Sequence, residues 1–98
     1  MTKAEIIAEM SEATGLQKKD ALIAVESFME IVKKHMCEGE NVYLRGFGTF
    51  LIKHRAQKTA RNISKNTTLV IDAHNFPGFK PAKSFAQRMK GEEVTAED

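Results

Sequence analysis

The chain has 98 residues, of which 42% are hydrophobic and 29% charged, and its formal net charge is +2. This length fits one small domain with a thin stability margin, and the composition is that of a soluble globular protein rather than a disordered tail or a membrane span. The first residues, MTKAEIIAEM, mix Glu5 and Glu9 with apolar side chains, so they resemble neither a secretory signal nor an anchor, and we expect a cytoplasmic protein.

The charges are segregated along the chain. Residues 1–52 carry six Lys and Arg against eight Asp and Glu, a net −2, whereas residues 53–90 carry nine against one, a net +8. The last eight residues, GEEVTAED, hold four acids and no base. This asymmetry predicts that the second half of the chain meets a polyanion, most economically a nucleic acid.

Two helices are predicted at the N-terminus. Thr2 and Glu5 form a capping-box pattern, apolar residues then recur at helical spacing, and Gly15 is a stop signal, which predicts a helix over 3–14. The same rhythm continues over 18–39 as a second, longer helix with a wide apolar stripe. One short neighbouring helix is too small to cover that stripe, so we expect something else to pack there.

Strands follow the second helix. NVYLRGFGTFLIKHR predicts a short strand, a tight turn at Gly46 and Gly48 and a second strand, and a third strand resumes at 69–71 and runs towards Phe76. The intervening QKTARNISKNTTLVI is polar and basic. We therefore predict a three-stranded antiparallel sheet with a long ribbon arm at about 54–75, which is mobile until it lies on a ligand because such ribbons are marginal in water.

The last part of the chain again contains apolar residues that are expected to pack. Pro81 stands ahead of a short predicted helix at about 82–90, with Phe85 and Met89 on one side. Residues 1–90 are thus predicted to form a single α+β domain. The acidic residues 91–98 are expected to be a flexible tail.

No catalytic, cofactor or metal-binding set is visible. Cys37 is the single cysteine, which excludes an internal disulfide or a second zinc-binding thiol, and we expect it to be buried or half-buried. A dinucleotide fingerprint fails because no third glycine follows Gly48. His54 and His74 are expected to form an ordinary cross-strand pair. The sequence predicts no enzyme, no cofactor, no metal and no small-molecule substrate.

The order of these elements, with LRGFGTF, the dipeptide RN near the hairpin tip and FPGFKPAKSF, resembles the bacterial HU and integration host factor family of histone-like proteins. The likeness extends from about Thr2 to Lys90 without a gap. It implies an intertwined dimer that binds and bends duplex DNA through the minor groove in the bacterial nucleoid, with little sequence specificity.

The resemblance also implies roles for particular residues. Phe47, Phe50 and Phe79 look like core aromatics of the dimer. The residues expected to contact DNA are Lys3, Arg45, Lys53, Arg55, Lys58, Arg61, Asn62, Ile63, Lys65, Lys80, Lys83 and Lys90. Ile63 replaces the proline that the family usually inserts between base steps; an isoleucine is also an apolar wedge but leaves the tip less rigid.

Several alternatives stay open at this stage. The chain could be a sequence-preferring subunit like integration host factor, a duplex RNA-binding protein or a protein-only scaffold. Phosphate contacts alone do not separate DNA from RNA. The partner chain is either an identical copy or a paralogue.

Overall fold

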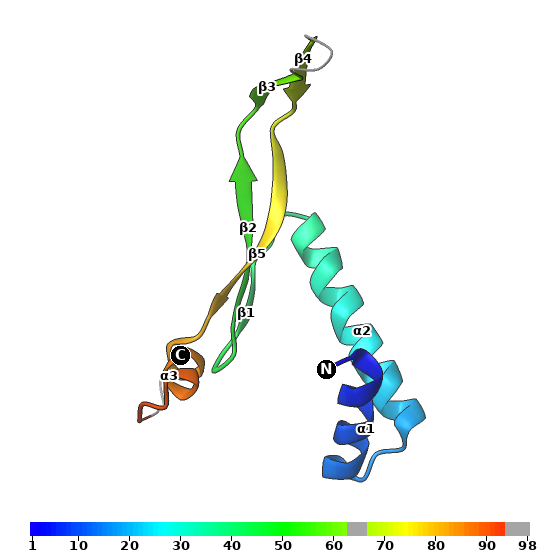
Figure 1. The fold of residues 1–98 in the computed structure, drawn as a ribbon. Helices are drawn as coiled ribbons and strands as arrows, with labels where there is room; N and C mark the ends of the chain where they lie inside the picture. The colour runs from blue at the N-terminus through cyan, green and yellow to red at the C-terminus, as the bar shows by residue number, and fades with distance from the viewer. Residues whose placement is uncertain (63–66, 94–98) are drawn as a thin grey trace.

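The computed structural model describes residues 1–62 and 67–93 and has the predicted α+β architecture (Figure 1). Two N-terminal helices precede a three-stranded sheet, a two-stranded ribbon extends from it, and a third helix ends the described chain. The elements are α1 (Lys3–Thr14), α2 (Lys18–Cys37), β1 (Val42–Leu44), β2 (Gly48–Arg55), β3 (Lys58–Asn62), β4 (Thr67–Ile71), β5 (His74–Pro81) and α3 (Lys83–Lys90).

The α1–α2 hairpin begins and turns at the predicted signals. The Thr2 hydroxyl accepts a hydrogen bond from the Glu5 backbone N–H, and the Glu5 carboxylate accepts one from the Thr2 N–H, which completes the capping box. Gly15 ends α1 with φ 79°, a left-handed conformation that costs glycine little. Ile7 of α1 and Ala21 of α2 are buried between the helices.

The sheet has the strand order β1-β2-β5, and all its neighbours are antiparallel. Its register sorts the side chains onto two faces because alternate residues of a strand point to opposite sides. One face is apolar: it carries Val42 opposite Phe50 and Phe50 opposite Phe79, with Ile52 opposite Pro77. The other face is basic and is described below.

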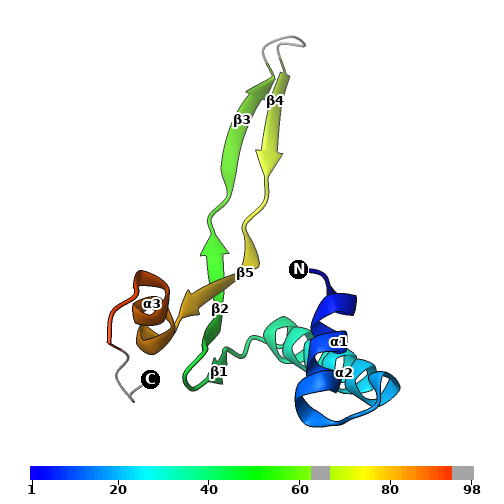
Figure 2. The same cartoon turned by 60° about the horizontal axis from the view of Figure 1, so that its bottom comes forward.

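Aromatic rings gather on the apolar face and hold α3 to the sheet. The Phe50 and Phe79 rings lie 4.9 Å apart between centroids, and Phe47 stacks on Phe85 of α3 at 5.6 Å. The backbone adds to this link, since the Ala82 N–H donates to the Phe47 carbonyl at 2.9 Å. The β1–β2 turn, β5 and α3 therefore form one packed corner, at the opposite end of the sheet from the ribbon (Figures 1 and 2).

The ribbon β3–β4 is a separate two-stranded sheet in line with β2 and β5 (Figure 2). Residues 56–57 and 72–73 interrupt the strands, two residues on each limb. The register therefore continues without a slip, from Arg55 opposite His74 to Lys58 opposite Ile71. All of β4 is exposed, so the described ribbon lacks the buried apolar face that would stabilise it alone.

A single chain buries very few of its apolar side chains. Only Ile7, Ala21 and Ala82 are buried apolar residues among those described. The radius of gyration is 19.2 Å, whereas a compact domain of about 100 residues has about 13 Å. Large apolar side chains stay exposed on α2 and on the apolar face of the sheet, notably Ile23, Phe28, Ile31, Phe47 and Phe79. The chain thus has the elements of a core without the second layer that would close it.

Two local predictions were wrong. His54 and His74 do not face each other: His54 lies opposite Asn75, with 2.9 Å from its Nδ1 to the amide Oδ1, and His74 lies opposite Arg55. The register is set by the apolar pairs nearer the sheet, and it places the two histidines on opposite faces. Cys37 is exposed rather than half-buried, because it points to a different side of α2 from the half-buried His35 and Met36.

Candidate nucleic-acid interface

The face of the sheet opposite the aromatic cluster is basic. The register aligns Tyr43, Thr49 and Lys80 in one row across the three strands, and Lys53 and Arg55 follow along β2 on the same side. None of the residues of these three strands, all of which the structure describes, is Asp or Glu. The face is therefore positive along its length and leads directly into the ribbon.

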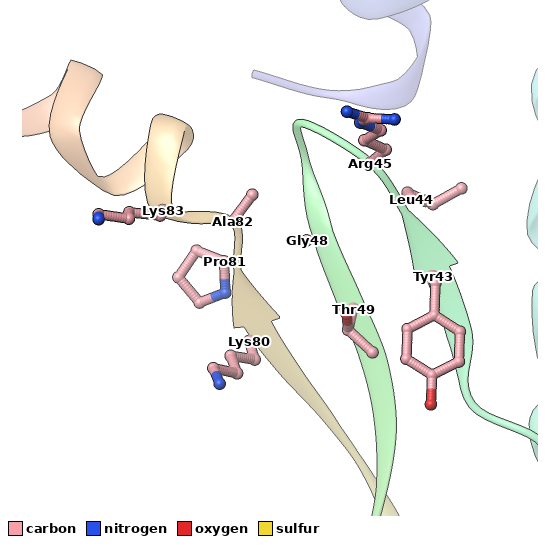
Figure 3. A pocket seen from close by; sticks show the side chains of 9 residues that line it. All are labelled: Tyr43, Leu44, Arg45, Gly48, Thr49, Lys80, Pro81, Ala82 and Lys83. Carbon is pink, nitrogen blue, oxygen red and sulfur yellow. The ribbon is translucent and has the colours of Figure 1, made fainter. Parts of the chain in front are cut away.

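At the end of the sheet near α3, this basic surface includes a pocket of about 710 Å³ (Figure 3). Three predicted DNA contacts line it: Arg45 from the β1–β2 turn, Lys80 from the end of β5 and Lys83 from the first turn of α3. The structure thus brings Arg45 to the same pocket as Lys80 and Lys83, which follow it by 35 and 38 residues in sequence. Tyr43 and Thr49 also line the pocket and were not predicted as site residues.

At the root of the ribbon, two cationic side chains are held over their neighbours. The Lys53 side chain lies over Gly78, close enough that a Cβ there would stand 2.7 Å from its Cε. The Arg55 guanidinium lies over the Phe76 ring, 5.0 Å from the centroid, a cation–π contact. These contacts orient both charges on the basic face.

The ribbon continues the basic surface away from the body. Lys58 and Arg61 stand on β3, and their side chains alternate between its two faces. Asn62 pairs with Thr67 through the strand register. The predictions for Ile63 and Lys65 lie outside the described residues, as does the expected flexibility of the tail at 94–98.

Two predicted contacts lie apart from this surface. Lys3 begins α1 and forms an ion pair of 2.7 Å with Glu26 of α2. That hydrogen bond, and the charge of Lys3, lower the pKa of the Glu26 carboxyl. The pair therefore persists at neutral pH and is lost as the pH falls through the lowered pKa. Lys90 lies in the last turn of α3, where a cation also interacts favourably with the helix dipole.

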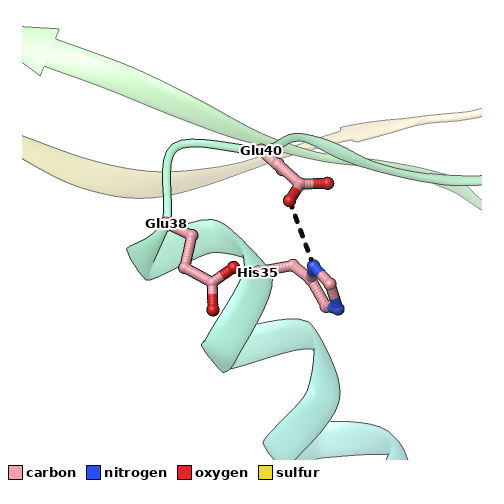
Figure 4. A group of neighbouring side chains, drawn as sticks. All are labelled: His35, Glu38 and Glu40. Carbon is pink, nitrogen blue, oxygen red and sulfur yellow. Dashed lines mark hydrogen bonds and ion pairs between the residues drawn. The ribbon is translucent and has the colours of Figure 1, made fainter.

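One group of the described residues has metal-binding types. His35, Glu38 and Glu40 bring ligand atoms within 4.8 Å of one another at the end of α2 (Figure 4). Glu40 already pairs with His35 at 3.3 Å, and all three side chains are exposed or half-buried. A side-chain contact between His35 and Glu40 beside a neighbouring carboxylate accounts for this group, and we assign no metal to it.

An open basic face that extends into a two-stranded basic arm defines a nucleic-acid-binding protein. The chain belongs to the bacterial DNA-binding protein family, whose model matches residues 1–90. It is 40% identical over 88 residues to the DNA-binding protein HU of Lactococcus lactis, covering 90% of this chain and 97% of that protein. It is 33% identical over 90 residues to HU of Thermus thermophilus, covering 92% and 93% respectively.

A solved structure agrees with this assignment. The chain is similar to the HU of an Anabaena HU–DNA cocrystal structure, with a TM-score of 0.84 at 28% identity, over 91% of this chain and 97% of that one. Among the described residues, no helix combines the length and apolar character needed to cross a bilayer.

Proposed function

We propose that the protein is an architectural DNA-binding protein that binds and bends duplex DNA through the minor groove, with little sequence preference. The observation that carries the proposal is the basic face of the sheet, whose three strands contain no Asp or Glu. This face continues from the pocket at Arg45 and Lys80 through Lys53 and Arg55 towards the ribbon. Charges in such a line match a phosphate backbone, which positions a duplex without reading its sequence.

The binding unit in this proposal is a dimer. The exposed apolar residues of α2 and the exposed Phe47 and Phe79 need a second layer, and an identical copy or a paralogue offers a matching surface. Two ribbons then extend from one body, one on each side of a duplex. Residues 1–90 form this domain, and the acidic residues 91–98 lie outside it.

The work proposed is mechanical rather than chemical. Bending costs deformation energy, which the added phosphate contacts along two ribbons offset, so sites that deform easily are preferred. No cofactor or small-molecule substrate enters this mechanism. A protein with this role acts in the bacterial nucleoid, in the cytoplasm.

The proposal is tested with the full chain on several duplex DNAs of unrelated sequence and on duplex RNA, at a series of salt concentrations. We expect similar affinities for all the DNA sequences, weaker binding to RNA, and affinity that falls linearly with salt on logarithmic axes. Equal or tighter binding to RNA would reassign the ligand. Strong preference for one DNA sequence would favour a subunit like integration host factor, and binding to neither would favour a scaffold.

A further inference from the structure

The C-terminal segment, residues 91–98, is strongly acidic. It holds four acids and no base, and it follows residues 53–90, whose net charge is +8. Glu92 and Glu93, which the structure describes, are exposed, and none of the ion pairs among the described residues involves them. Acids at a chain end often serve solubility alone. A role beyond solubility requires a cationic surface that the segment can reach.

The pocket beside α3 is such a surface. Arg45, Lys80 and Lys83 line it, and none of its lining residues is acidic. Figure 3 shows these three cations around the end of the sheet, where β5 leads into α3. The volume of about 710 Å³ is within the range of pockets that hold small ligands, so it has room for a few residues of extended chain.

The end of α3 places the acidic segment within reach of this pocket. Lys83 is the first of the eight residues of α3, a length of about 12 Å. At Gly91 the chain leaves the helix with φ 78°, and the Glu92 N–H donates to the Gln87 carbonyl, as in a Schellman motif. The seven residues that follow Gly91 span up to about 23 Å when extended. The segment is therefore long enough to return to the pocket.

The two ends of α3 favour the same placement. Carboxylates are unfavourable near a helix C-terminus and favourable near an N-terminus. Glu92 and Glu93 follow the C-terminus directly, where Arg88 and Lys90 offset part of the repulsion. The N-terminus borders the pocket, and its first turn contains no acid. Carboxylates that move from the first end of this helix to the pocket thus gain electrostatic energy from the helix as well as from the pocket cations.

We propose that the acidic segment 91–98 occupies this pocket when DNA is absent and competes with DNA phosphates for Arg45, Lys80 and Lys83. The inference rests on the proposed function, since it takes the same cations as DNA contacts. The segment lowers the affinity for DNA, because only the molecules with an open pocket bind fully. Salt screens the contact between exposed charges, so the inhibition is greatest at low ionic strength.

Carbodiimide crosslinking tests the contact without DNA. The reagent joins carboxylates to lysine amines that lie against them, and mass spectrometry locates the joined residues. We expect crosslinks from the acidic segment to Lys80 or Lys83 in the full-length protein, and their loss at high salt or with saturating DNA. Crosslinks to Lys90 alone, its neighbour in sequence, or no crosslinks from the segment would overturn the inference.

Neutralisation of the segment tests the competition. The variant replaces its four acids with the matching amides: Glu92→Gln, Glu93→Gln, Glu97→Gln and Asp98→Asn. It should bind duplex DNA about two- to thirtyfold more tightly at low salt, the range that two exposed ion pairs would give. The gain should vanish as salt rises, so the neutral variant should have the steeper salt slope. An unchanged affinity at low salt would overturn the inference.

A matched control makes the same change in net charge elsewhere. It neutralises four exposed acids of the first two helices and their ends: Glu9→Gln, Glu12→Gln, Asp20→Asn and Glu38→Gln. This control measures how far a general loss of negative charge favours DNA, and we expect a smaller gain from it. An equal gain from both variants would mean that the segment acts only through net charge, which would overturn the inference.

The pocket cations provide a second control. In a protein with Lys80→Gln and Lys83→Gln the segment has lost two of its partners, so its neutralisation should raise the affinity much less than in the wild type. An undiminished gain would show that the segment repels DNA without occupying the pocket.

These measurements also separate the two hypotheses. If neither the wild type nor the neutral variant binds duplex DNA, the proposed function fails, and the crosslinks alone decide whether the segment occupies the pocket. If both bind duplex DNA with the same affinity, only this inference fails.

Discussion

Gly48 and Gly78 of the sheet have different neighbours, so we expect different effects when each is replaced by alanine. A Cβ at Gly48 would stand 2.5 Å from the Phe79 ring and 2.6 Å from the Lys80 carbonyl oxygen, so Gly48→Ala must shift backbone. We expect it to destabilise the protein by about 1–3 kcal/mol, the range for overpacking. Thermal unfolding at a fixed protein concentration measures the destabilisation.

Gly78→Ala is the matched control, because the three atoms nearest to a Cβ there all belong to the flexible Lys53 side chain and none to the backbone. It should leave the unfolding temperature nearly unchanged and weaken DNA binding, since Lys53 must leave its place on the basic face. Equal destabilisation of the two variants would contradict the packing described here.

Ile63 carries a prediction that comes from the sequence and the family resemblance. If its side chain wedges between base steps, Ile63→Ala should preserve most of the affinity and reduce the bend. Energy transfer between dyes at the two ends of a bound duplex measures the bend. The same transfer efficiency for Ala and Ile at this position would exclude a wedge. Ile63→Val is a control that keeps most of the apolar surface.

At the scale of residues, the sequence predicted features that depend on neighbouring residues and missed those that depend on distant parts of the chain. The Thr2–Glu5 cap and the Gly15 stop were predicted and confirmed, because both act within one turn of chain. The expected pairing of His54 with His74 was wrong by one register step, since apolar pairs elsewhere in the sheet set the register. The pocket that Tyr43 lines was also missed, because its residues come from β1, β2, β5 and α3 and meet only when these elements are aligned.

At the scale of elements, the ribbon makes a prediction about salt. Charge reversal of Lys58 and Arg61 together should weaken binding to all DNA sequences and flatten the logarithmic salt slope by roughly 0.9 for each phosphate that the variant no longer neutralises. Reversal of Lys33 and Lys34 changes the net charge equally at two exposed positions that belong to α2 and not to the strands, so it serves as the control. An unchanged salt slope for the ribbon variant, or equal salt slopes for both variants, would show that the ribbon is not part of the DNA-binding surface.

The positions of the helices and strands were predicted more completely than the interruption that separates the ribbon from the sheet. Helical periodicity and the Gly46 turn placed the helices and the first strands within a few residues. The break at 56–57 and 72–73 was not foreseen, because Ala56 and Ala73 give no breaking signal of the kind that Gly or Pro would give. The interruption separates the ribbon from the sheet and keeps its register.

For the whole molecule, the decisive observation is that one chain buries very few of its apolar side chains. If a second chain supplies the missing layer, folding and association are linked, and the unfolding temperature should rise with protein concentration. Phe28→Glu places a charge on the exposed apolar side of α2, where dimerisation would bury it without a partner at a cost of about 3–5 kcal/mol. We expect this variant to lose the dimer and most of its helical signal together.

Lys34→Glu is the matched control, because it adds a carboxylate to the same helix at an exposed charged position. It should remain a dimer with nearly unchanged stability. Sedimentation equilibrium gives the mass, and circular dichroism over a range of concentrations gives the linkage. A wild-type chain that is monomeric and has a concentration-independent unfolding temperature would contradict the dimer. The DNA-binding surface would then be a single basic face with one arm, unable to hold a duplex from two sides.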